Sequence, residues 1–153
     1  MSRMHHFNED RKRRLDLLAS SAQADLAERY AALEPTAPPA TPVRGPEIGT
    51  VMLRGRAGGG GATFNLGEAT VTRATVKLAT GEVGHAIVLG RHPQKASIVA
   101  HLDALSQLSD WVQVIETNFV TPALAEQDAA RIRQAEETEA TRVDFFTMVR
   151  GED

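Results

Sequence analysis

The chain has 153 residues, of which 42% are hydrophobic and 24% charged, values typical of one folded domain. Its formal net charge of −3 argues against a dedicated nucleic-acid binder, which usually carries a strong basic surface. Because the sequence contains no cysteine, this chain alone cannot form disulfides or supply thiolates to a zinc ion or an iron–sulfur cluster.

The N-terminal residues contain no apolar core of the kind that marks a secretory signal. No apolar run elsewhere approaches the roughly 18 residues that a membrane helix needs. We therefore expect a cytoplasmic protein that does not contact a membrane.

Residues 8–33 are expected to form one long amphipathic helix. Asn8 is a suitable N-cap, and apolar side chains then recur at steps of three and four residues from Leu15 to Leu33. The basic run at residues 11–14 is interpreted as a solvated or partner-facing patch, with nucleic-acid binding as the less favoured alternative.

Five of the seven prolines lie between Pro35 and Pro46. Since proline lacks an N–H and fixes φ, residues 34–47 are excluded from helix and from a central strand. They are predicted to form a semi-rigid, polyproline-like linker, which would let the N-terminal helix dock at a distance from the following domain.

An α+β core is expected at residues 48–141. Runs rich in Val, Ile and Thr at residues 48–56, 68–78 and 83–91 predict an antiparallel meander, with a tight turn at residues 80–82 between the last two strands.

The rest of the core is expected to alternate helix and strand. A helix should begin with Pro93 at its first position, and the near alternation at residues 111–117 predicts a fourth strand. Thr121 and Pro122 resemble a cap followed by a first helical residue, so a third helix is expected to reach about Thr138. The predicted fold is thus a small antiparallel sheet of about four strands with three flanking helices.

The C-terminal segment, residues 142–153, is apolar on both of its alternating sets of positions. An exposed copy of such a segment would be prone to aggregate, so we expect it to be buried as a strand. It would either close its own sheet or add to the sheet of another chain. The candidate interface residues are Val143, Phe145, Phe146, Met148 and Arg150.

The stretch RGRAGGGGATFNL, residues 54–66, contains four consecutive glycines. It lacks the Gly-Lys-Ser/Thr of a Walker loop, and Thr63 stands where a dinucleotide fingerprint needs its third glycine. Successive glycine N–H groups can still bind an anion. An ordinary hairpin loop with solvent-facing arginines is the favoured alternative. The anion-binding candidates are Arg54, Arg56, Gly58, Gly59, Gly60, Gly61 and Arg73.

No residue is assigned a catalytic role. The histidines do not form HxH or HExxH spacings, so no metal site is expected, and His85 is interpreted as a hydrogen-bonded sheet residue rather than a catalytic one. Glu68 is more readily explained as a strand-entry carboxylate than as a general base, and no serine lies in a nucleophile elbow.

Three segments carry a resemblance to one family. Residues 54–78 (RGRAGGGGATFNLGEATVTRATVKL), 84–92 (GHAIVLGRH) and 141–152 (TRVDFFTMVRGE) closely resemble the G subunit, PhnG, of the bacterial carbon–phosphorus lyase system. The resemblance covers nearly the whole chain and is weakest at residues 1–12 and in the proline-rich segment.

The resemblance implies a part in a complex that displaces adenine from ATP with methylphosphonate. The product would be α-D-ribose 1-methylphosphonate 5-triphosphate, an intermediate of phosphonate catabolism. The implied partners are PhnI-, PhnH- and PhnJ-like subunits, a transient PhnL-like subunit, and a second copy of this chain. ATP would be a substrate of the complex, with no cofactor expected on this subunit alone.

Two roles remain open within that complex. The favoured one is structural and activating, with the sheet and the C-terminal segment buried against other subunits. The alternative is direct binding of a triphosphate or phosphonate by Arg54, Arg56, Arg73 and the glycine loop. A stand-alone enzyme is the least favoured role.

Overall fold

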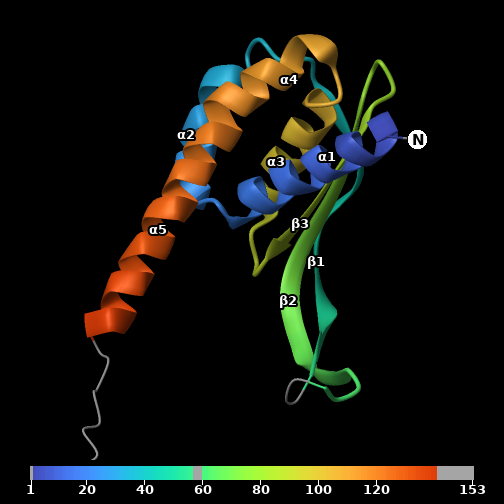
Figure 1. Cartoon of the computed structure of the whole chain (residues 1–153). Helices are drawn as coiled ribbons and strands as arrows, with labels where there is room; N and C mark the ends of the chain where they lie inside the picture. Colours follow the sequence, from blue (N-terminus) through green and yellow to red (C-terminus); the bar gives the residue numbers. More distant parts are fainter. Residues whose placement is uncertain (1, 57–59, 141–153) are drawn as a thin grey trace, which may run out of the picture.

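The computed structural model describes residues 2–56 and 60–140, and side chains from residue 8 onward within those ranges. Its elements follow one another as α1 (Ser2–Ser20), α2 (Gln23–Leu33), β1 (Ala40–Gly55), β2 (Phe64–Leu78), β3 (Val83–Leu89), α3 (Pro93–Leu105), α4 (Ser109–Ile115), the π-helix η1 (Glu116–Val120) and α5 (Thr121–Ala140). The helices gather on one side of a three-stranded sheet, and α5 stands away from that sheet (Figure 1).

The sheet is the predicted antiparallel meander, with strand order β1-β2-β3. The turn between β2 and β3 is closed by two backbone hydrogen bonds, from Gly81 N–H to Leu78 C=O (3.0 Å) and from Leu78 N–H to Glu82 C=O (2.9 Å). The predictions of α+β class, of an antiparallel sheet and of strands within residues 68–78 and 83–91 are therefore confirmed.

The core lies between the sheet and α3. Alternate residues of β2 and β3 point toward the helix, and Val88 and Leu78 are almost completely buried there. Gly84 lets the helix come close, because a Cβ at this position would lie 1.9 Å from the carbonyl oxygen of Ala100. The fully buried face of α3 thus rests directly on β3.

The single helix predicted at residues 8–33 is wrong. The structure has two helices, the first beginning at Ser2 and the second at Gln23. The hydroxyls of Ser20 and Ser21 donate to the carbonyl of Leu17 at 3.0 and 2.9 Å, and Ala22 is extended (φ −62°, ψ 134°). Serine side chains that bond to nearby carbonyls compete with the hydrogen bonds of the helical backbone, so α1 ends at Ser20. The apolar pattern from Leu15 to Leu33 is therefore divided between two helices.

The prediction of a proline-rich linker also needs correction. Strand β1 begins at Ala40 and therefore includes Pro42 and Pro46. Proline is tolerated because β1 is an edge strand, and the pairing register shifts between Pro42 and Arg44 and again between Arg44 and Glu47. The N-terminal helices therefore pack on the body of the molecule, next to α3, rather than at a distance from it.

The fourth strand predicted at residues 111–117 is also wrong, since this segment forms α4 and the start of η1. Ile115 and Phe119 lie four residues apart and are both buried, a helical spacing that the short alternating run concealed. Thr121 has helical dihedrals (φ −60°, ψ −48°), so it does not cap a new helix. Pro122 cannot donate a helical N–H, and the π-helix η1, with its wider turn, ends at Val120 just before it. The helix then continues into α5.

The predicted helix beginning at Pro93 is confirmed, and α5 ends close to the predicted position. Of the residues of α5, Ala123 alone is buried, so most of this helix is in contact with solvent. Within the described ranges, no helix is long and apolar enough to cross a membrane.

Candidate docking surface

Strands β1 and β2 continue beyond β3 as a two-stranded ribbon. Strand β3 pairs with β2 between Val71 and Lys77, and Gly90 N–H donates to Thr70 C=O, whereas residues 64–69 of β2 pair with β1 alone. We call residues 51–55 and 64–69 the ribbon arm, and Figure 1 shows it projecting past the helices that cover the sheet. A two-stranded ribbon is at best marginally stable in water, so this arm is a candidate for support by another molecule.

The ribbon arm exposes large hydrophobic side chains on both of its faces. Paired residues point to the same face, so Met52, opposite Glu68, lies on the core side, and Leu53, opposite Gly67, lies on the other. Four large apolar side chains of the arm are between 45% and 62% exposed, namely Met52, Leu53, Phe64 and Leu66. Clustered exposed apolar side chains of this kind mark interaction sites.

The sequence prediction did not identify these residues as functional. It assigned residues 48–56 to a strand and focused on the glycines instead. The sequence does contain a signal for this surface. In the strand ends beside the glycine loop, both alternating sets of positions include apolar residues, which does not suit a sheet with one solvated face.

The tip of the arm carries part of the predicted anion site. Arg54 and Arg56 are exposed, and Arg54 Nη2 lies 3.3 Å from the hydroxyl of Thr63 across the hairpin. Gly60 and Gly61 follow in a turn and a bend, whereas Gly58 and Gly59 lie outside the described residues. Among the described residues, neither arginine has a carboxylate partner, so both guanidinium groups are available to an anion or to an acidic surface.

Arg73 lies elsewhere on the sheet. Arg54 pairs with Asn65 on β2, and Arg73 is eight residues further along that strand, about 26 Å away at roughly 3.3 Å per residue. Its Nη2 lies 3.2 Å from Glu47 Oε1, an oxygen that also lies 2.7 Å from Arg44 Nη2. The structure therefore does not bring Arg73 together with Arg54 and Arg56.

The described histidines have hydrogen-bond partners, as inferred for His85. His85 Nδ1 lies 3.1 Å from the Thr75 hydroxyl, and His92 Nδ1 lies 3.0 Å from the side-chain oxygen of Gln23. Within residues 8–56 and 60–140, no group of three or more His, Asp or Glu side chains is close enough to hold a metal ion.

A buried polar pair that the sequence did not reveal joins α2 to α3. His101 Nε2 lies 2.8 Å from the carbonyl of Pro38 and must donate to it, so Nδ1 accepts from the Tyr30 hydroxyl at 2.7 Å. Burial, with a smaller contribution from the Glu34 carboxylate, raises the pKa of Tyr30 to about 12. Both side chains line a cavity of about 240 Å³ beneath the proline-containing start of β1.

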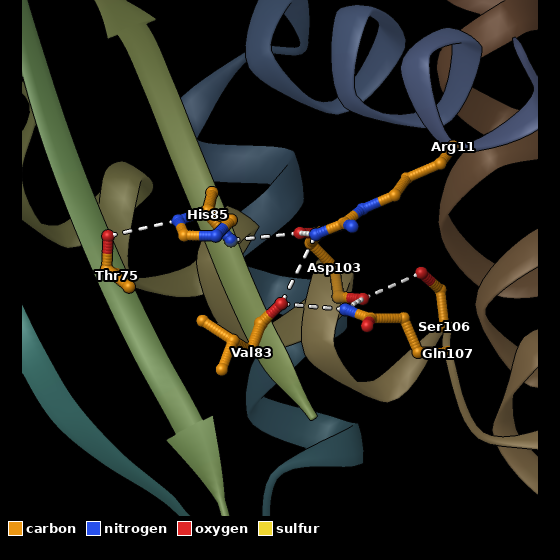
Figure 2. Close-up of polar contacts among 7 residues, drawn as sticks. All are labelled: Arg11, Thr75, Val83, His85, Asp103, Ser106 and Gln107. Atoms are coloured by element: carbon orange, nitrogen blue, oxygen red, sulfur yellow. Dashed lines mark hydrogen bonds and ion pairs between the residues drawn. The ribbon is translucent and has the colours of Figure 1, made fainter. Parts of the chain in front are cut away.

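A second polar cluster fixes the position of the sheet relative to the helices. The carboxylate of Asp103 on α3, which is almost completely buried, accepts from Arg11 on α1 at 2.9 and 2.7 Å and from the backbone N–H of His85 at 2.9 Å. Figure 2 shows that Arg11 and Gln107 also reach the carbonyl of Val83, at 3.2 and 2.8 Å. The hydrogen bond and charge of Asp103 raise the pKa of Arg11.

The interface candidates in the C-terminal segment, from Val143 to Arg150, lie outside the described residues. The last described element before that segment is α5, which ends at Ala140. This helix runs away from the sheet, and its last turn stands apart from the other elements (Figure 1).

Known proteins resemble this chain over nearly its whole length. Residues 9–151 match the family model described as "Phosphonate metabolism protein PhnG". The chain is also 51% identical over 148 residues to a protein of Rhizobium meliloti (strain 1021), a match that covers 94% of this chain and 90% of that protein. The relative is named alpha-D-ribose 1-methylphosphonate 5-triphosphate synthase subunit PhnG.

Proposed function

Because this chain belongs to the PhnG family of phosphonate metabolism proteins, we propose that it is a non-autonomous subunit of an α-D-ribose 1-methylphosphonate 5-triphosphate synthase. The observation that carries the proposal is the 51% identity to the named synthase subunit over 94% of the chain. The complex would join methylphosphonate to the ribose of ATP, with adenine displaced, in the cytoplasm.

The proposed role is structural and activating. The ribbon arm supports it, since four exposed apolar side chains on a two-stranded extension suit burial against another subunit. The proposed partners are PhnI-, PhnH- and PhnJ-like subunits, a transient PhnL-like subunit and a second copy of this chain. Residues 143–150 are proposed as a further contact.

Substitution in the ribbon arm tests this role. Leu66→Asp in the full chain, co-expressed with the partner subunits, should reduce recovery of the complex about tenfold, the effect of losing about 1.4 kcal/mol of binding energy. Synthase activity, measured as triphosphate product formed from ATP and methylphosphonate, should fall in parallel.

Val43→Asp is the matched control, because Val43 is 61% exposed and Leu66 62% exposed, yet Val43 lies outside the ribbon arm. The control should assemble normally. Equal recovery of both variant complexes would contradict docking through the arm.

A second candidate role is anion binding at the tip of the arm by Arg54, Arg56, Gly60 and Gly61. The absence of a carboxylate partner for either arginine among the described residues favours it. Arg56→Ala should then leave assembly intact and raise KM for ATP or methylphosphonate at least about fivefold, as expected for loss of a charge-assisted hydrogen bond. Unchanged kinetics in an assembled complex would eliminate this role.

A further inference from the structure

The free edge of β3 is divided into a closed half and an open half. Residues 83 and 85 direct backbone groups away from β2, because Val83 C=O accepts from Arg11 and Gln107 and His85 N–H donates to Asp103. Even-numbered residues face β2 instead, as shown by the 2.8 Å hydrogen bond from Gly90 N–H to Thr70 C=O. Figure 2 shows the side chains that close the first half of the edge.

The second half of this edge has no such cover. By the same alternation, the N–H and C=O of Ile87 point away from β2, and no hydrogen bond from a described residue reaches them there. A groove of about 240 Å³ runs beside them, between α1 and β3, lined by Leu15, Asp16, Ala19, His85, Ala86, Ile87 and Val99. We call this edge and groove the β3 slot.

The β3 slot has apolar surface on both sides of the position that a further strand would take. Leu15, Ala19 and Val99 line the groove on the core side, and Ile87 and Leu89 are 59% and 73% exposed on the opposite face. An added strand would therefore need apolar residues at both sets of alternating positions. In strand addition the main-chain hydrogen bonds give affinity and the alternate side chains give specificity, so this requirement is selective.

One segment of this chain has that pattern. In residues 143–149, VDFFTMV, one alternating set contains Val143, Phe145 and Val149, and the other contains Phe146 and Met148. Arg142 and Arg150 flank the segment, and the largely exposed carboxylate of Asp16, which lies 3.1 Å from Lys12 Nζ, lines the groove and gives it an acidic group for one of these arginines. The segment itself lies outside the described residues.

The direction of α5 indicates which copy supplies the segment. Twenty helical residues rise about 30 Å, and beyond Ala123 none of them is buried against the body. The end of this helix stands apart from the sheet of its own chain (Figure 1). We propose that residues 143–149 of a second copy pair with the open half of β3, and that two chains exchange these segments in a closed two-fold dimer.

This proposal rests on the proposed function in one respect, because it specifies the contact with a second copy of the chain named there, and its test on the isolated chain can fail while the synthase role holds. Sedimentation velocity on the full chain tests it. The wild-type chain should be a dimer. Phe146→Asp in the segment and Ala19→Glu in the slot should each weaken the dimer at least tenfold, or about 1.4 kcal/mol. Ala27→Glu on α2, also at a half-buried alanine but away from the slot, should leave the dimer intact.

Mixing the two defective variants separates exchange from other arrangements. The Phe146→Asp chain keeps an intact slot and the Ala19→Glu chain keeps an intact segment, so an equimolar mixture should form a heterodimer with one working contact. A mixture that stays monomeric means that the segment docks on its own chain or elsewhere, and it overturns the proposal. A monomeric wild-type chain, or a dimer unaffected by Phe146→Asp, overturns it as well.

A second pair of variants applies if either chain fails to fold. Ile87→Lys blocks the edge at a side chain that is 59% exposed, and Met148→Asp alters the other face of the segment. The expected and contradictory results are the same as for the first pair.

Discussion

Asp103 joins three elements through one buried carboxylate. It accepts a bidentate hydrogen bond from Arg11 and a further one from the N–H of His85, while its side chain is 1% exposed. Hydrogen bonds to an ionised group are stronger than neutral ones, and removing one partner of a buried pair leaves the other uncompensated.

We therefore expect Asp103→Asn to lower the free energy of unfolding by about 2–4 kcal/mol. Urea denaturation followed by circular dichroism would measure the change. Asp16→Asn serves as the control, because the Asp16–Lys12 pair is largely exposed and should contribute less than about 0.5 kcal/mol. Similar losses in both variants would show that the buried cluster does not stabilise the fold specifically.

Tyr30 is the only tyrosine in the sequence, so its ionisation can be followed without interference from others. In a spectrophotometric titration, phenolate absorbance should appear with a midpoint near 12 in the folded chain and near 10.0 in denaturant. The folded state binds this proton more tightly than the unfolded chain does. Stability from the neutral phenol is thus present below pH 10 and is lost as the pH rises toward 12. A common midpoint in both states would contradict this burial.

The partners of Tyr30 and Asp103 could not be predicted from the sequence. Tyr30 and His101 are 71 residues apart, and Arg11 and Asp103 are 92 residues apart. Tyr30 meets His101 because α2 packs on α3, and Arg11 meets Asp103 because α1 packs on α3 and β3, and local residue patterns contain no information about that packing. The role of His85 as a hydrogen-bonded sheet residue could be predicted without knowledge of helix packing, because its partner Thr75 lies on the adjacent strand of the same hairpin.

At the scale of elements, the packing of α3 on β3 depends on a missing side chain. A Cβ on Gly84 would lie 1.9 Å from Ala100 C=O and 2.6 Å from Ala104 N, so the helix could not keep its position. Both contacts are with backbone atoms, which cannot move aside as a flexible side chain can.

Gly84→Ala should therefore destabilise the fold by roughly 2–4 kcal/mol through overpacking. Thermal or urea unfolding would measure the loss. Gly60→Ala is the control, since a Cβ there meets nothing within 4 Å, and its unfolding midpoint should be unchanged. If Gly84→Ala unfolded at the wild-type midpoint, α3 would have to be free to move outward from β3.

The strands of this chain were easier to predict than its helix boundaries. Residues 68–78 and 83–89 are rich in Val, Ile and Thr and are separated by a glycine turn, so strand propensity and pattern agree. Residues 111–117 are too few to separate helical from strand periodicity. The extent of β1 was missed because its prolines suggested an irregular segment, and only the position of the strand at the sheet edge makes them acceptable.

For the molecule as a whole, stability should be unevenly distributed. Residues 71–78 of β2 lie between two strands and beneath a helix, whereas the ribbon arm has one pairing partner and exposed side chains on both faces. Segments with few buried apolar contacts open at a lower free-energy cost than the core does.

We expect amides in residues 51–55 and 65–69 to exchange hydrogen at least about tenfold faster than those in residues 71–78, as for regions of lower local stability. Native-state hydrogen exchange with mass spectrometry would measure this on the isolated chain. Assembly with the proposed partner subunits should slow exchange in the arm selectively. Uniform protection of both regions in the isolated chain would mean that the arm is stable without a partner.

The prolines near the start of β1 have a consequence for how far this protein can assemble. A sheet with two receptive edges can accept a strand on each side and so grow into an open-ended fibre. Here Pro42 and Pro46 remove donors from one edge, and the register shifts beside them disturb its spacing, while β3 is closed along half its length. The start of β1 and the first half of β3 thus do not accept a further strand, which limits the stretches along which this sheet can be extended and favours assemblies of finite size.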